Sequence, residues 1–202
     1  MRKIEMIPFV GVDDTACGKL RFGMSKEEVE QLLGEGNYST ETAFFPGAPA
    51  ARGCYADPRP YTAYCQYRVY FSEADKAVEI TLFPALPEDD TEISLHGVSL
   101  FRHKSEVVIA ELENQAACTW DGQDKDLGTQ YDFDALAFSL WRSSAFHQKL
   151  FDDAAYMQEY REMLPENQEE ELKYQYFQAA SLYTRELYTA QQTWIESLQL
   201  PR

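Results

Sequence analysis

The chain carries four cysteines, the residue type that can serve both as a nucleophile and as a metal ligand. They are Cys17, Cys54, Cys65 and Cys118. Thiolate metal sites use close pairs such as C-x-x-C or a Cys–His cluster, whereas the nearest two cysteines here have ten residues between them. We therefore expect no metal site. Without a secretory signal in the chain, free thiols are favoured over disulfides.

Other arrangements that support catalysis are missing as well. None of the three histidines stands in an H-E-x-x-H pattern, and there is no G-x-S-x-G, P-loop or G-x-G-x-x-G. The carboxylates of Asp121, Asp124 and Asp126 lack the glycine and final glutamate of a calcium loop, so we interpret them as a hydrated loop. We predict no catalytic residue, no cofactor and no enzymatic activity.

Aromatic side chains in a proline-rich segment are a more suggestive feature. Residues 40–60 contain four prolines and two glycines, which favour a long loop, with room for an edge segment, over a helix or a central strand. Aromatic residues in a loop beside an acid are typical of protein interfaces. The alternative is that the loop folds back and buries them. The predicted interface residues are Phe44, Phe45, Tyr55, Asp57 and Tyr61.

The charge balance narrows the class of partner. The chain has 34 Asp+Glu against 18 Lys+Arg, so 18 − 34 = −16, and every quarter of the sequence is acidic. Nucleic-acid binders and proteins that dock on anionic lipid concentrate Lys and Arg, so both classes are disfavoured. A basic protein partner fits this charge. Oligomeric state is left open.

The N-terminus and the hydropathy pattern indicate where the protein works. Glu5 and Pro8 interrupt any apolar run at the N-terminus, so we expect no signal peptide. No stretch of about 18 apolar residues exists to span a membrane. We expect a cytoplasmic protein.

The first predicted element is a helix with clear signals at both its start and its end. Ser25 and Glu28 form a capping box, Val29, Leu32 and Leu33 share one face, and Gly34 ends the helix. Alternation over 61–71 and 78–82 then predicts an antiparallel hairpin. A second unit follows with a strand near 93–95, a helix over 104–112 and a hairpin of 131–133 with 137–141. A shift of 79 residues lays the first unit weakly on the second, which leaves an internal duplication open.

The C-terminal quarter is predicted to be helical. An apolar stripe runs from Phe146 to Met157 and ends near Pro165. Residues 168–199 again step by threes and fours, which favours one long helix. A strand at about 176–184 is the competing interpretation, and periodicity does not separate the two.

The stretch from Phe22-Gly23-Met24-Ser25 to Leu33-Gly34 resembles the helix that opens each repeat of β-lactamase-inhibitor-like proteins. In these proteins the helix precedes antiparallel strands, and inhibitor members carry two tandem units. The chain is also similar to bacterial proteins proposed as immunity proteins of toxin systems, through Phe9-Val10-Gly11-Val12 and residues 96–101. The resemblance covers about residues 9–142. The sequence shows no lipoprotein signal, and the resemblance assigns no inhibitory residues.

Together these features predict an α+β protein. Residues 1–144 would form two tandem helix–antiparallel-hairpin units on a curved sheet, at about 9–90 and 91–144. Residues 145–202 would form a helical extension packed on the same domain. The expected function is non-enzymatic: an immunity protein that neutralises a basic toxin. The alternatives are an enzyme of unrecognised type, using carboxylates or the Cys17 thiol, and a module that self-associates through its last helix.

Overall fold

The protein is built from two sheets that share one core. The computed structural model describes residues 1–43, 45–56, 65–84 and 90–198. The smaller sheet has the order β3-β2-β1-β8-β9, in which only β1 and β8 run parallel. Its strands are β1 (Arg2–Ile7), β2 (Gly11–Asp14), β3 (Gly18–Arg21), β8 (Thr91–Leu95) and β9 (Val98–Ser99).

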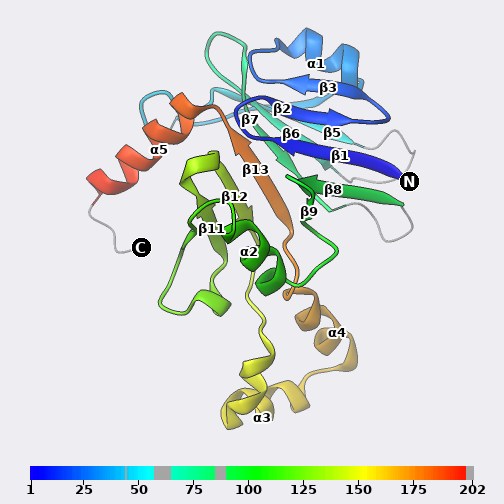
Figure 1. Cartoon of the computed structure of the whole chain (residues 1–202), viewed down its shortest axis with the longest axis vertical. Coiled ribbons are helices and arrows are strands. Elements are labelled where there is room, and N and C mark those ends of the chain that lie inside the picture. The colour runs from blue at the N-terminus through cyan, green and yellow to red at the C-terminus, as the bar shows by residue number, and fades with distance from the viewer. Residues whose placement is uncertain (44, 57–64, 85–89, 199–202) are drawn as a thin grey trace.

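The larger sheet has eight strands in the order β10-β11-β12-β13-β7-β6-β5-β4, and all its neighbours are antiparallel. Its last strand along the chain, β13, lies in the middle, between β12 and β7 (Figure 1). The strands are β4 (Asn37–Thr40), β5 (Ala51–Ala56), β6 (Cys65–Phe71), β7 (Ala77–Leu82), β10 (Thr119–Trp120), β11 (Gln130–Phe133), β12 (Phe138–Trp141) and β13 (Ala179–Tyr183).

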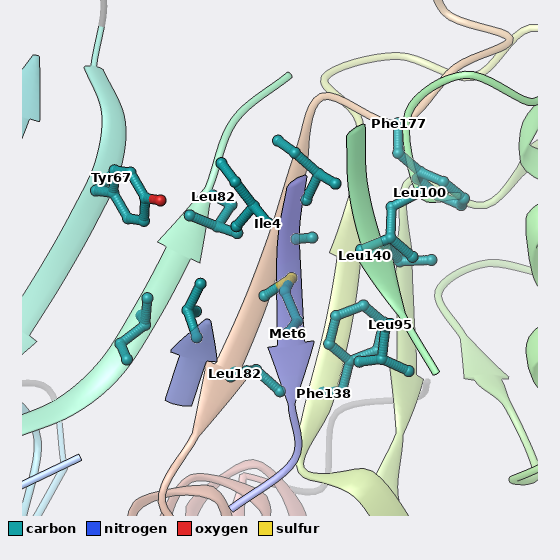
Figure 2. Packing of buried hydrophobic residues seen from close by; sticks show 14 of the residues in the cluster. Ile4, Met6, Tyr67, Leu82, Leu95, Leu100, Phe138, Leu140, Phe177 and Leu182 are labelled. Atoms are coloured by element: carbon teal, nitrogen blue, oxygen red, sulfur yellow. The ribbon is translucent and has the colours of Figure 1, made fainter. Parts of the chain in front are cut away.

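Alternation within the strands decides which side of the larger sheet is buried. Ile80 and Leu82 of β7 are fully buried, as are Leu140 of β12 and Leu182 of β13. Figure 2 shows such residues gathered with Ile4 and Met6 of β1, between the two sheets. Because successive residues of a strand point to opposite faces, the residues between these apolar ones must lie on the outer side.

Two helices complete this core. Helix α1 (Lys26–Leu33) begins at Ser25, whose hydroxyl accepts from the Glu28 amide while the Glu28 carboxylate accepts from the Ser25 amide. The predicted capping box is therefore confirmed. Helix α2 (Ser105–Glu113) confirms the second predicted helix but has no side-chain cap. Val29 of α1 and Leu112 of α2 are fully buried in the shared core.

The predicted hairpins are confirmed, and the proline-rich segment needs a correction. β6 pairs with β7, and β11 pairs with β12, both antiparallel. Residues 51–56, predicted as part of a long loop, form the interior strand β5 between β4 and β6. The prolines that argue against a strand lie outside this stretch, so its backbone donors are free to pair.

The C-terminal region departs most from the periodicity. The long helix over 168–199 is wrong, and the competing strand is confirmed as β13, between α4 (Pro165–Lys173) and α5 (Arg185–Ser197). The helix predicted from Phe146 is divided at Asp153, which caps α3 (Ala154–Glu162) after the short 3₁₀ turn η3 (Gln148–Asp152). In Figure 1, α3 and α4 extend beyond the sheets.

The architecture is therefore α+β, with five α-helices and two mostly antiparallel sheets among the described residues. Two further 3₁₀ turns flank β11, namely η1 (Lys125–Leu127) and η2 (Asp134–Leu136). Across the part of the chain that the structure describes, no helix has the length and apolar character needed to cross a bilayer.

Candidate binding face

The outer side of the larger sheet carries polar side chains that cross it in two straight rows. The strand registers place Ser139, Ser181, Thr81, Arg68 and Cys54 in line across five strands, with Asp132 at one end. The neighbouring row is Tyr183, Glu79, Tyr70, Arg52 and Ser39. We call these two rows, with Gln130 and Trp141 beside them, the polar face.

Hydroxyl groups tie the middle of the polar face together. The hydroxyls of Thr81 and Ser181 lie 2.7 Å apart. Ser139 donates to the Asp132 carboxylate over 2.6 Å, and the Gln130 amide donates to the same oxygen over 2.8 Å. Because Ser139 and Thr81 are almost fully buried, these hydrogen bonds offset the cost of removing their hydroxyls from water.

Trp141 is the large apolar side chain that this face presents to solvent. It is 42% exposed, at the end of β12, and it is paired in register with Gln130 and Ala179. An exposed tryptophan among hydrogen-bonding groups is typical of the residues that contribute most to protein interfaces. The polar face therefore has the composition of a binding surface.

Glu79 is the acid of the polar face whose pKa is raised into the neutral range. It is half-buried on β7, where Thr81 donates a hydrogen bond of 3.2 Å to its carboxylate. Burial raises the pKa of Glu79 to about 7, against the smaller opposing effects of Thr81 and of the Arg68 charge. Near neutral pH this carboxyl therefore exists in both protonation states.

The two arginines of the polar face are engaged elsewhere. Arg52 lies 3.1 Å from the Glu41 carboxylate and donates to Ser39 over 3.2 Å. The Arg68 guanidinium lies 4.6 Å from the centre of the Phe83 ring, and its Nε is buried without a hydrogen-bond partner. Neither forms an ion pair with Glu79 among the interactions of the described residues.

The interface residues predicted from the sequence are divided by the structure. Phe44, Asp57 and Tyr61 lie outside the described residues. Phe45 is partly buried against α5, with its ring 5.8 Å from that of Trp194. Tyr55 is only 1% exposed, and its hydroxyl lies 2.6 Å from that of Tyr38. In this conformation Tyr55 presents no surface to a partner.

Cys17 lies in a buried polar cluster at the end of the smaller sheet. Arg2 donates to Asp14, to Gln66 and to the Cys17 sulfur, the last over 3.3 Å. Burial, assisted by the Asp14 charge, raises the pKa of the Cys17 thiol. A nucleophilic cysteine needs a lowered pKa, so this environment opposes such a role.

The Asp14 carboxylate is the anchor of that cluster. Burial by itself raises the pKa of Asp14, but hydrogen bonds from Arg2 and Tyr67 outweigh it and hold the pKa at about 2. Asp14 is therefore charged at any physiological pH, and its role is to bind Arg2 and Tyr67 into the core. The arrangement is a structural ion pair.

Two hollows in the surface adjoin acidic side chains, among them the Asp14 carboxylate. One of about 330 Å³ lies between η2 and α5, beside Asp134, Arg185 and Tyr188. Another of about 310 Å³ lies on the smaller sheet, beside Lys3 and Lys19. Glu79 and Cys17 line neither hollow. Within the described residues no group of three His, Cys, Asp or Glu side chains is arranged to hold a metal ion.

The sequence carried part of the signal for the polar face. Glu79 and Thr81 alternate with apolar residues in the predicted hairpin, and so do Ser139 and Trp141 in the second one. Ser181 and Tyr183 were missed because the helical interpretation of 168–199 placed them on a helix. No family model, curated protein or solved structure matches the chain.

Proposed function

We propose that this chain is a non-enzymatic binding protein of the immunity type, which neutralises a basic protein toxin by docking its polar face on it. The observation that carries the proposal is the polar face itself, where the exposed Trp141 lies beside a row of carboxylate and hydroxyl groups. One side of this sheet is covered by the core, and the other presents the exposed Trp141 side chain.

The negative net charge of the chain favours a positively charged partner. A net charge of −16 raises the rate at which a basic protein reaches the surface, and this steering weakens as salt screens it. Toxins that attack nucleic acid need basic surfaces to hold phosphate. An acidic inhibitor in the cytoplasm would meet such a toxin at its site of action.

The proposed architecture behind this face is a pair of tandem helix–hairpin units. The order of elements supports it: β2, β3, α1 and then β4 to β7 in the first half, β8, β9, α2 and then β10 to β13 in the second. In this arrangement each half contributes four strands to one sheet, and the polar face crosses the boundary between them. Both α1 and α2 then pack on the opposite side.

Affinity capture at low salt, followed by a growth assay, tests the proposal. The expected result is a basic protein that elutes as salt rises, arrests growth of a bacterial host when expressed alone, and is tolerated when this chain is co-expressed. Capture of no protein, or of a toxin whose effect this chain leaves unchanged, would contradict it. A chain with Leu164→Ala, on the exposed turn between α3 and α4, is the matched control.

An enzyme remains the second candidate because of Glu79. A carboxyl with a pKa of about 7 can exchange protons efficiently at neutral pH, as a general acid or base must. Substitution of Glu79 distinguishes the two functions. Loss of Glu79 abolishes turnover in an enzyme but leaves a binding protein with a measurable affinity.

Self-association through the last helix has less support. The buried residues of its stripe, Leu187 and Tyr188, pack on Ala137 and Tyr183 of the same chain. Tyr188 also donates to Asp134 over 2.6 Å. These contacts engage the stripe within one molecule, so removal of α5 should damage the fold rather than change the oligomeric state.

A further inference from the structure

Trp141 differs from the other two tryptophans in that its ring has no packing partner among the described residues. Trp120 has the Lys125 ammonium 5.4 Å from its ring centre, and Trp194 packs against an aromatic ring 5.8 Å away. Neither a cation nor a second ring of the described chain lies on the indole of Trp141, which is 42% exposed. Helix α5 packs over Ala137, at the opposite end of β12 from Trp141. The indole is therefore open to a partner.

A carboxylate oxygen without a donor lies beside this indole. Asp132 of β11 stands directly opposite Ser139, two residues before Trp141 on β12, so Asp132 and Trp141 are diagonal neighbours on the same face. Diagonal neighbours lie about 7–8 Å apart, which long and aromatic side chains can span. Ser139 and Gln130 donate to Oδ1 of Asp132 over 2.6 and 2.8 Å. Within the described chain no donor reaches Oδ2, so this oxygen is left to accept from a partner.

The charge at this end of the polar face is negative. The Gln130 amide donates to the Asp121 carboxylate over 2.9 Å, and the Asp121 amide donates to the Gln130 carbonyl oxygen over 3.2 Å. Asp121 and Asp132 therefore place two acidic groups around Gln130. Lys125, in the turn that follows β10, is paired with Glu113 over 2.5 Å. A cation approaching Trp141 meets attraction, and an anion meets repulsion.

From this geometry we infer that the polar face recognises an arginine side chain of its partner, whose guanidinium stacks on the Trp141 indole and donates to Oδ2 of Asp132. The inference rests on the proposed function and names the residue type that the face binds. A guanidinium is planar, so it can lie against an aromatic ring while its N–H groups point outward to a carboxylate. The ammonium of lysine is a compact, strongly hydrated charge without such a plane, so it fits this pair of groups less well.

An arginine pentapeptide and a lysine pentapeptide of equal charge provide the test, by NMR titration of the full chain at low salt. The arginine peptide should shift the indole N–H of Trp141 and the amide of Asp132, and bind at least about threefold more tightly than the lysine peptide. Asp132→Asn should weaken binding of the arginine peptide at least about fivefold. This substitution keeps one oxygen to accept from Ser139 and Gln130 and removes the charge, so the fold should persist, as the spectrum itself reports.

Glu169→Gln is the matched control, because it removes the same charge from the exposed acidic run of α4, and it should change the affinity less than about twofold. Equal affinity for the two peptides, or equal weakening by Asp132→Asn and Glu169→Gln, would overturn the inference, because the peptides would then bind the general negative charge. Failure here is distinct from failure of the proposed function. A captured toxin that loses affinity for Trp141→Ala but not for Asp132→Asn would overturn the inference and leave the proposed function standing.

Discussion

The hydroxyl groups of Thr81 and Ser181 lie 2.7 Å apart, although one hundred residues separate them in the chain. This contact joins β7 of the first half of the chain to β13 near its C-terminus. Because β13 also pairs with β12, the polar rows continue without a gap from β11 to β5. The outer face is thus one surface built from distant segments.

The stability of the protein should fall as pH rises from about 5 to 7.5, because of Glu79. Its folded pKa of about 7 lies above the ordinary 4.5, so in this window the folded state binds more protons than the unfolded state. Allowing for partial exposure, the loss should be about 1–3 kcal/mol. Urea unfolding at several pH values measures it.

Glu79→Gln should remove this slope and stabilise the protein at pH 8, since it replaces a half-buried charge by a neutral group of the same shape. Glu169→Gln, on the exposed surface of α4, should leave the slope unchanged. If Glu79→Gln destabilised the protein at pH 8, the environment assigned to Glu79 would be wrong. A residue that costs stability in the free protein is typical of a site kept for binding.

Asp14 should stabilise the fold far more than its neighbour Asp13. Asp14→Asn leaves Arg2 and Tyr67 without a charged acceptor in a buried site, and we expect a loss of about 2–4 kcal/mol. Asp13 pairs with Arg21 at a site where its side chain is 38% exposed, so Asp13→Asn should cost under about 1 kcal/mol. Urea unfolding at pH 7 compares them.

Acid gives an independent check on Asp14. Its folded pKa of about 2 lies below the ordinary 3.8, so its contribution is complete above pH 4 and is lost as pH falls toward 2. Asp14→Asn should therefore flatten the stability curve below pH 4. Equal curves for wild type and Asp14→Asn would refute the buried ion pair.

Arg142 should hold residues 148–173, the helical segment formed by η3, α3 and α4, to the sheets. It is fully buried and donates to the carbonyl oxygens of Phe146 and Tyr174, which stand at the two ends of that segment. It also donates to Gly128, Asp126 and the Ser105 hydroxyl. Arg142→Met would leave these acceptors unpaired, so we expect a loss of about 3–5 kcal/mol.

Hydrogen exchange locates the effect of Arg142→Met. Amides of η3, α3 and α4 should lose protection before those of β6 and β7, because the segment is attached through this side chain. Arg161→Met, on the exposed surface of α3, is the control and should change stability by less than about 0.5 kcal/mol. Uniform loss of protection across both sheets would contradict a local role for Arg142.

Local patterns in the sequence predicted some elements well. Ser25 and Glu28 define the start of α1 through contacts three residues apart, so the capping box could be read directly. The hairpin of β6 and β7 likewise pairs two strands that are neighbours in the sequence. What these patterns share is that the interactions which stabilise each element lie within or beside it.

The strand β13 could not be read in this way. Its apolar residues match a helical spacing, and its identity as a strand depends on β12 and β7, which are distant in sequence. The polar face depends on the same pairing. Alternation indicated that Glu79 lies on the solvent side of its strand, but only the register with β13 places Tyr183 opposite it. Long-range pairing therefore determined what the sequence left open.

Whether the polar face binds the toxin is measured by the affinity of that toxin for Trp141→Ala, compared with its affinity for the wild-type chain. Trp141 is 42% exposed on the polar face, and Leu164 is 66% exposed on the helical segment away from it. If the polar face binds the toxin, Trp141→Ala should raise the Kd at least about tenfold, and Leu164→Ala less than about twofold. An unchanged Kd for Trp141→Ala, together with weaker binding by Leu164→Ala, would place the interface outside the polar face.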